Sequence, residues 1–216
     1  MKNIKIIMNL LSRKYNDFNK RTTLNRMRKK PEPFKILISC LLSLRARDET
    51  TEVISKELFK IADTPEKISK LSTKKLEKII FSTGHYHKKA QTLKQVSNEI
   101  IKRFNSKVPS TKEELLSIKG IGLKTANVVL SFAYGQQVIV VDTHVHRISN
   151  RLGFVQTTNA DKTEKELIKI MPKKYIQETN GILILFGREI CQPISPWCSR
   201  CPIEKYCPKI NVKKSR

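Results

Sequence analysis

A lysine follows two glycines in the segment 120–129, which reads GIGLKTANVV. Lys124 falls in the first turn of a helix that we predict to begin at Leu123, where the helix dipole is unfavourable to a cation. The neutral amine is the nucleophilic form of lysine, so this position suits attack on an electrophilic carbon. The simpler interpretation is a phosphate contact, and this stretch taken alone favours it.

A carboxylate comes next along the chain, directly after the apolar run 138–141 (VIVV). Asp142 precedes the segment THVHRISNRL, and an aspartate at such a position is a good helix N-cap. An acid held there, in a cleft opposite Lys124, is also able to stabilise a sugar oxocarbenium ion or to assist proton transfer. Helix cap and catalytic acid are both compatible with these residues.

The turn in front of Lys124 is predicted to bind an anion. Lys119, Gly120, Ile121 and Gly122 separate a helix ending near Ile118 from the next helix. Glycine permits positive φ and lets another backbone approach closely. Amides of the turn, together with the start of the following helix, then form a site for a phosphate of DNA, read without regard to sequence. Gly-x-Gly alone is a weak signal, and the Lys-Thr-Ala that follows, with Thr125 at its centre, makes it stronger.

Four of the five cysteines lie near the end of the chain, in the pattern Cys191-x6-Cys198-x2-Cys201-x5-Cys207. The fifth, Cys40, sits in the apolar run FKILISCLLSL and is predicted to pack in the core. Clustered cysteines in a chain with no secretory signal indicate a metal centre rather than disulfides. Spacing and thiol chemistry do not separate a zinc site from an iron–sulfur cluster.

The histidines occur as two pairs spaced i,i+2. Residues at this spacing point to different faces of a helix, so we do not expect either pair to share a metal. We interpret all four as residues that face DNA or pack: His85, His87, His144 and His146.

The composition favours a polyanionic partner. Lys and Arg number 43 against 19 Asp and Glu, a formal net charge of +24. This excess indicates nucleic acid, and no apolar run approaches the roughly 18 residues of a membrane span. The N-terminal stretch lacks the features of a signal peptide. We therefore expect a cytoplasmic, DNA-associated monomer with no membrane partner.

Helical patterns position these residues. Helix starts are predicted at Thr64-Pro65, at Ser72, and at a capping box formed by Ser110 and Glu113. An apolar stripe over 91–104 predicts a long helix. Only 138–141 resembles a strand, and one strand has nothing to pair with. The fold class is therefore all-α.

Taken together and in this order, the hairpin LLSIKGIGLKTANVVL, the segment VDTHVHRISNRLG and the cysteine pattern resemble the endonuclease III family of helix–hairpin–helix DNA glycosylases. ILISCLLSLRARDETT and FSTGHYHKKAQTL match two further family segments, so the resemblance covers roughly residues 30–210. It implies two helical domains: a six-helix barrel over 22–134 with the helix–hairpin–helix at about 111–134, and a second domain from 1–21 plus 135–216. It also implies that the cysteines of the loop 191–207 hold a [4Fe–4S] cluster, and that the active site lies in the cleft between the domains.

The resemblance further implies base excision repair of double-stranded DNA that contains damaged bases or abasic sites. In the family pattern Lys124 is the nucleophile and Asp142 the catalytic carboxylate of a bifunctional N-glycosylase and AP lyase. Such an enzyme removes damaged, oxidised pyrimidines and cleaves 3′ to the abasic site by β-elimination. The DNA-binding residues are then expected to be Lys119, Gly120, Ile121, Gly122, Thr125, Arg45, His85 and His144.

The chain departs from the family pattern at the two residues expected to fill the gap left by the flipped base. The bacterial pattern has Gln where this chain has Arg45, and Leu where it has His85. The preferred lesion and opposite base are therefore not predicted. Two other functions remain: a monofunctional glycosylase for T/G or U/G mismatches, and a non-catalytic DNA-binding module with a structural metal. Relatives of the mismatch type carry Tyr or Ser at the position of Lys124, which argues against the first.

Overall fold

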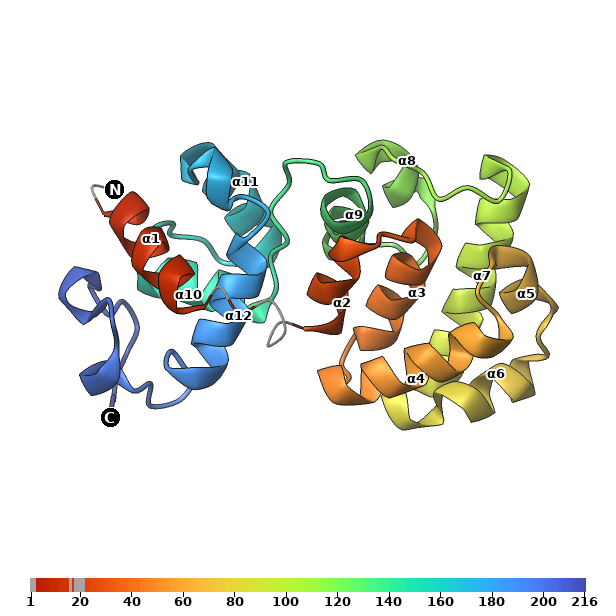
Figure 1. Cartoon of the computed structure of the whole chain (residues 1–216), viewed down its shortest axis with the longest axis horizontal. Helices are drawn as coiled ribbons and strands as arrows, with labels where there is room; N and C mark the ends of the chain where they lie inside the picture. The colour runs from red at the N-terminus through yellow and green to blue at the C-terminus, as the bar shows by residue number, and fades with distance from the viewer. Residues whose placement is uncertain (1–2, 16, 18–21) are drawn as a thin grey trace. The chain divides into compact units, whose positions relative to one another are not determined.

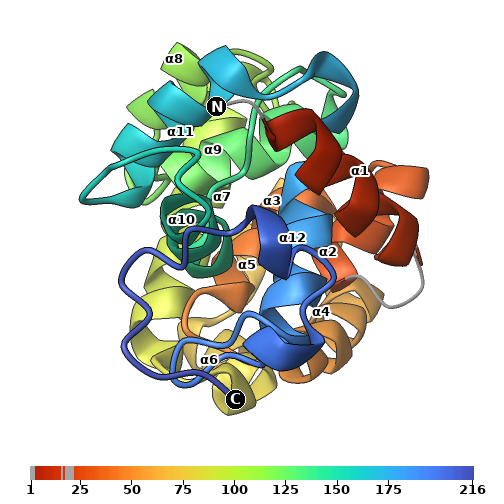
Figure 2. The ribbon, with the colours of Figure 1, turned by 90° about the vertical axis from the view of Figure 1, so that its left-hand side faces the viewer.

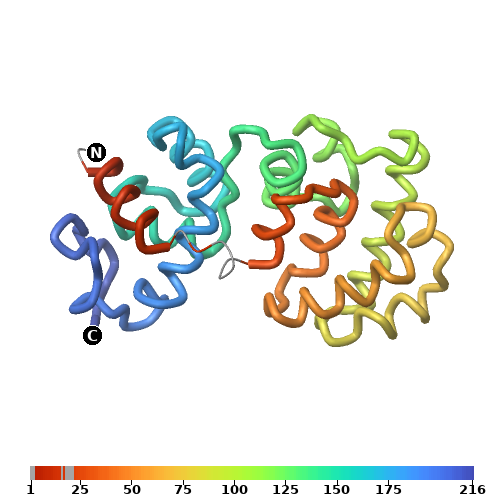
Figure 3. The backbone as a smooth tube through the Cα atoms, viewed as in Figure 1, coloured from red at the N-terminus to blue at the C-terminus, as the bar shows by residue number. Residues whose placement is uncertain are grey.

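A computed structural model describes residues 3–15, 17 and 22–216, and over these residues it contains helices and loops but no strand (Figure 1). This confirms the all-α fold class. The chain divides into two compact units, one from Thr22–Gly135 and the other from Met1–Arg21 together with Gln136–Arg216 (Figure 3). Part of the N-terminal segment assigned above to the second domain, residues 1–2, 16 and 18–21, lies outside the described residues.

The unit Thr22–Gly135 carries the candidate nucleophile and the glycine hairpin. Its helical elements are α2 (Thr23–Arg26), η2 (Met27–Lys29), α3 (Pro33–Ser43), α4 (Asp48–Ile61), α5 (Pro65–Lys70), α6 (Thr73–Ile80), η3 (Phe81–Thr83), α7 (Tyr86–Phe104), α8 (Lys112–Ser117), α9 (Leu123–Val128) and the π-helical segment η4 (Val129–Ala133). α7 is 19 residues long, and its face with Leu93, Val96 and Ile100 is buried. It packs against α3, α5 and α6, which places it at the centre of this unit.

Side-chain caps set the starts of α2, α5, α6 and α8 in this unit. Thr64 and Ser72 accept the amide hydrogens of Lys67 and Lys75, which confirms the predicted starts of α5 and α6. The capping box predicted at Ser110 and Glu113 is wrong by one residue. Thr111 is the N-cap of α8, and its hydroxyl both accepts from the amide of Glu114 and donates to the carboxylate of Glu114.

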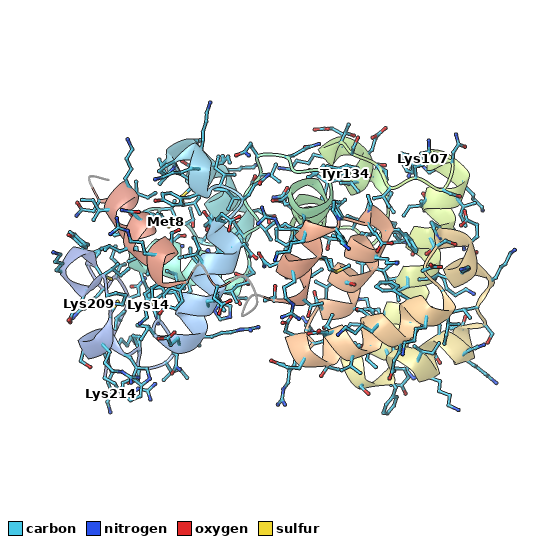
Figure 4. The ribbon with its side chains drawn as sticks, in the orientation of Figure 1. Met8, Lys14, Lys107, Tyr134, Lys209 and Lys214 are labelled. Atoms are coloured by element: carbon cyan, nitrogen blue, oxygen red, sulfur yellow. The ribbon has the colours of Figure 1, made fainter. Side chains whose placement is uncertain are left out.

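The end of the hairpin helix is tied to the loop that follows α7. α9 continues into η4, where the backbone widens to π-helical bonding. Tyr134, directly after η4, donates its hydroxyl hydrogen to the carbonyl of Val108 (Figure 4). This bond closes a loop of the chain around α8 and thereby restrains both flanks of the hairpin.

The second unit carries the candidate carboxylate and the cysteines. Its described elements are α1 (Ile4–Lys14), α10 (Thr143–Arg151), α11 (Ala160–Ile170), η5 (Lys173–Tyr175), α12 (Thr179–Glu189), η6 (Cys198–Arg200) and η7 (Glu204–Tyr206). α1 adds its apolar face to the core, in which Met8 is fully buried (Figure 4). α10 and α12 lie side by side (Figure 2). A Cβ at Gly187 of α12 would meet Nδ1 of His144 at 2.5 Å, so glycine permits this close approach.

The apolar run 138–141 is neither helix nor strand in the described part of the chain. Ile139, Val140 and Val141 are buried, and the carbonyl of Val140 accepts a hydrogen bond from Asn180 at 3.1 Å. This buried connection leads directly to Asp142. Among the residues that the structure describes, no helix is both long and apolar enough to cross a membrane.

Candidate active site

The two glycines of the hairpin occupy different kinds of position. Gly120 has φ +101°, and a Cβ added to it would meet Cγ2 of Thr92 at 2.9 Å. Both the backbone conformation and the contact with α7 therefore require glycine at this position. Gly122 has φ −95°, and an added Cβ would find no atom within 4 Å. The fold therefore does not need a glycine at 122.

Not every group of the hairpin is free to meet a ligand. The amide of Ile121 donates to the carbonyl of Ile118 at 3.1 Å, and its side chain is 5% exposed. Thr125 is 3% exposed, and its hydroxyl accepts a hydrogen bond from the Cys40 thiol at 3.7 Å. The Ile121 amide and the Thr125 hydroxyl thus have partners within the protein, and DNA binding at Ile121 and Thr125 stays a prediction. Lys119 and the backbone around Gly122 remain exposed.

Lys124 lies beside Cys40. Burial raises the pKa of the Cys40 thiol, while the nearby charge of Lys124 and the hydrogen bond to Thr125 act in the opposite direction. Cys40 is fully buried where α3 packs against α9, which confirms its prediction as a core residue. Lys124 itself is partly exposed.

Asp142 is the N-cap of α10, as the helix-cap interpretation requires. Its Oδ1 accepts the amide hydrogen of Val145 at 2.9 Å, and the side chain is partly exposed. The cap uses one carboxylate oxygen, so the second remains for other chemistry. Burial lowers the pKa of His144, two residues further on, although the charge of Asp142 opposes that shift. Burial therefore favours the neutral form of this imidazole.

The remaining histidines make packing or surface contacts. Nδ1 of His146 lies 2.7 Å from Oγ1 of Thr163 on α11, which ties α10 to that helix. Nδ1 of His87 lies 2.8 Å from Oε1 of Glu77 at the surface. Among the described residues, no group of three or more His, Cys, Asp or Glu is positioned to hold a metal ion. Neither histidine pair belongs to such a group.

Arg45 and His85 lie in one pocket of the unit Thr22–Gly135. The pocket has a volume of about 500 Å³, and Gly120 of the hairpin also lines it. Both side chains are exposed, and both residues have left-handed backbone conformations, with φ 56° at Arg45 and φ 49° at His85. Non-glycine residues seldom adopt such φ values unless the surrounding structure enforces them. The structure therefore brings together two residues that are far apart in sequence.

The four C-terminal cysteines surround one cavity. They line it together with residues of α10, α12 and the C-terminal segment. Burial, together with the charges of the other three cysteines, raises the pKa of Cys201 to about 11. This mutual influence places the four thiols near one another.

Arginines of α10 hold the start of the cysteine loop. Arg151 donates to the carbonyls of Gln192 and Pro193, each at 2.6 Å, and to Sγ of Cys191 at 3.5 Å. Arg147 donates to the carbonyl of Cys191 at 2.8 Å. The backbone amide of Lys209 (Figure 4) donates to Sγ of Cys207 at 3.4 Å. These donors hold the loop and offset negative charge on the sulfur atoms.

Sequence reasoning missed three cations with a place in these sites: Lys89, Arg147 and Arg151. Lys89 lies at the i−4 position to Leu93, in line with the buried stripe of α7, and is itself 8% exposed. A lysine in register with an apolar stripe is the signal that would have marked it. Arg151 lies three residues after Ile148 on α10 and is also 8% exposed, so the same signal applies.

Comparison with known proteins agrees with this geometry. Residues 38–173 match the model of the HhH-GPD superfamily of base excision DNA repair proteins. The chain belongs to this superfamily. It is 41% identical to endonuclease III of Thermotoga maritima, over 84% of this chain and 85% of the relative. With endonuclease III of Rickettsia prowazekii it shares 38% identity over 81% of this chain and 82% of the relative.

Solved structures of the superfamily have the same fold. A trapped covalent intermediate of endonuclease III with DNA matches with a TM-score of 0.87 and 33% identity, covering 96% of this chain and 95% of that one. A thermostable thymine-DNA glycosylase matches with a TM-score of 0.86 over 96% of each chain. At 23% identity, the second likeness concerns the fold alone.

Proposed function

We propose that this chain is a bifunctional DNA N-glycosylase and AP lyase of base excision repair, acting on duplex DNA with oxidised pyrimidines or abasic sites. The observation that carries the proposal is the 33% identity, over 96% of the chain, to an endonuclease III trapped covalently on DNA. A lysine in the helix after the glycine hairpin supplies the amine that such an intermediate needs. The net charge of +24 supports a polyanionic partner, and we place the activity in the cytoplasm, with the protein as a monomer.

Lys124 is the proposed nucleophile. Its neutral amine attacks C1′ of the damaged nucleotide, and the N-glycosidic bond breaks as the base departs with its electron pair and takes up a proton. Loss of the ring C–O bond yields a Schiff base between Lys124 and the sugar, which makes the 2′ proton acidic. Removal of that proton expels the 3′ phosphate, and this β-elimination cleaves the strand. Water then releases Lys124 from the product.

Asp142 is the proposed catalytic carboxylate. Positive charge develops on the sugar as the base leaves, and a fixed negative charge stabilises it. The N-cap bond to Val145 fixes Oδ1 and leaves Oδ2 for this role. Lys124 and Asp142 belong to different units of the chain, and both are proposed to act on the same damaged nucleotide.

The hairpin is the proposed anchor for the DNA backbone. The first amides of α9 have no partner within their own helix, so they are available to a phosphate. Gly122, where an added side chain has open space around it, lets that phosphate approach the backbone. Lys119 adds long-range attraction. Arg45 and His85 are proposed to fill the gap left by the flipped nucleotide, and His144 to contact DNA near Asp142.

Cys191, Cys198, Cys201 and Cys207 are proposed to hold a [4Fe–4S] cluster. The four thiols line one cavity and would supply the four thiolate ligands that such a cluster needs. When bound, the cluster cross-links the C-terminal loop and stabilises it. Arg151 and the Lys209 amide then donate to the sulfur atoms of two ligands.

Borohydride trapping tests this function. A duplex with one oxidised pyrimidine, incubated with the protein and borohydride, should yield a covalent complex and a strand cut 3′ to the lesion. Lys124→Gln should abolish both products while DNA binding persists, because only the amine forms the Schiff base. Base release from T/G or U/G duplexes without trapping or strand cleavage would instead identify a monofunctional mismatch glycosylase. Binding with no base release would identify a DNA-binding module.

A further inference from the structure

Lys89 connects two segments of the unit Thr22–Gly135 from inside α7. Its side chain is buried, and Nζ donates to the carbonyl of Leu42 at 2.7 Å and to the carbonyl of Thr83 at 2.8 Å. Leu42 belongs to the last turn of α3, and Thr83 is the last residue of η3. One buried cation therefore links the ends of two helical segments that are far apart in the sequence.

Each acceptor lies two or three residues before one of the exposed residues in the pocket. Leu42 precedes Arg45 by three residues, and Thr83 precedes His85 by two. The other three carbonyls in the last turn of α3 accept hydrogen bonds from residues 43–46 of the same segment. The carbonyl of Leu42 instead depends on Lys89, which completes the end of the helix.

The conformations of Arg45 and His85 need such support. A left-handed non-glycine residue is strained and persists only where the surroundings enforce its conformation. A lysine that holds the preceding carbonyls limits how the two chain segments move relative to each other. The pocket of about 500 Å³ that both residues line also includes Lys89, so the buried amine lies next to the space that they define.

We propose that Lys89 is a positioning residue that fixes the loops of Arg45 and His85 relative to each other, and thereby sets the preference for the base opposite the lesion. This inference rests on the proposed function, in which Arg45 and His85 fill the gap left by the flipped nucleotide. Lys89 acts through these two residues and needs no contact with DNA of its own.

The burial of Lys89 supports a demanding structural role. Burial lowers the pKa of its amine to about 8, so it costs free energy to keep the amine charged inside the folded protein. Removing the amine leaves two buried carbonyls without their donor, which is costly enough to move the loops until other partners or water satisfy them.

Lys94 offers a matched control on the same helix. Its Nζ donates to the carbonyl of Ser69 at 2.9 Å and to the carbonyl of Leu71, and both carbonyls lie at the C-terminal end of α5. The chemistry is that of Lys89, but neither Lys94 nor these acceptors line the pocket of Arg45 and His85. Lys94→Met therefore removes an equivalent two-carbonyl link without touching the proposed loops.

The test measures binding to duplexes that contain a tetrahydrofuran abasic-site analogue opposite each of the four DNA bases. The readout is the ratio between the tightest and weakest Kd among these duplexes. Lys89→Met should lower this ratio by a factor of about 3 to 10, a coupling typical of residues in contact. Lys89→Gln, which keeps one donor and serves where the methionine variant does not fold, should lower it less. Lys94→Met should leave it unchanged.

A double-mutant comparison separates positioning from general loosening. In an Arg45→Ala/His85→Ala background, Lys89→Met or Lys89→Gln should change the ratio no further, because the residues through which Lys89 acts are gone. An unchanged ratio in folded Lys89 variants, an additive loss in that background, or an equal loss in Lys94→Met would each overturn the inference. These outcomes do not depend on strand cleavage. Failure of borohydride trapping in the unaltered protein would overturn the proposed function separately.

Discussion

At the scale of single residues, the hairpin shows how similar sequence signals can have different physical origins. Gly-x-Gly predicts a tight turn, but it does not say which glycine the fold requires. The structure assigns the positive φ and the close contact with Thr92 to Gly120, while Gly122 has an ordinary φ and open space beside it. The sequence could not separate them, because the difference depends on α7, which is distant in the chain.

Replacement by valine should therefore affect DNA binding at Gly122 and stability at Gly120. Gly122→Val should fold normally but weaken binding to damaged and undamaged duplex alike, because the hairpin contacts only the DNA backbone. Gly120→Val should lose about 2 kcal/mol or more of stability, from its conformation and its contact with Thr92. Urea unfolding and a filter-binding assay of both variants measure these effects. Normal affinity in Gly122→Val would remove the hairpin from the proposed DNA contact.

Asp142 presents the same question for a side chain with two roles. Its cap bond to Val145 is shown, and its catalytic role is proposed. Asparagine caps helices about as well as aspartate. The unfolding free energy of Asp142→Asn should therefore lie within about 0.5 kcal/mol of that of the unaltered protein. Turnover on an oxidised-pyrimidine duplex should nevertheless fall by at least about 100-fold, because the amide carries no charge. A folded variant with near-normal turnover would leave Asp142 only its role as a cap.

At the scale of elements, caps and apolar stripes predicted the helices well, and buried cations were the main omission. Thr64 and Ser72 mark helix starts because their effect is local, within three residues of the cap. The box assigned to Ser110 and Glu113 was displaced by one residue because Thr111 and Glu114 have the same spacing and equivalent chemistry. Lys89 was overlooked because its carbonyl partners belong to other segments, and because a lysine in a helix is usually expected to face solvent.

The environment of Lys89 predicts a characteristic pH dependence of stability. Its folded pKa of about 8 lies below the value of 10.5 expected for an unfolded chain. Between these values the unfolded chain binds the extra proton, so the unfolding free energy rises with pH. Relative to Lys89→Met, the unaltered protein should gain on the order of 1 to 3 kcal/mol between pH 7 and 10. Urea titrations of both proteins measure this difference, and a flat or falling difference would contradict the burial of a charged amine.

At the scale of the whole molecule, the family and the all-α class could be read from the sequence, since motif order and helical periodicity are properties of the chain itself. The juxtapositions could not. Cys40 beside Lys124, and Arg45 with His85 and Gly120 around one pocket, arise from packing of α3, α7 and α9. The cysteine loop is intermediate, because its spacing indicates a metal but the arginines that hold it lie about 40 residues earlier in the chain.

The cysteines provide a test of the metal centre with an internal control. Cys201→Ser should lose iron and visible absorbance, because a [4Fe–4S] cluster needs all four thiolates and serine is a poor substitute. Cys40→Ala should retain both, since that thiol is buried against Thr125 in the other unit. Arg151→Met should retain iron at first but lose it faster to a chelator, because the carbonyls of Gln192 and Pro193 then lack their donor. Iron and zinc analysis of anaerobically purified protein measures the outcome. Zinc in place of iron in the unaltered protein would contradict the cluster and identify the cysteines as ligands of a single zinc ion.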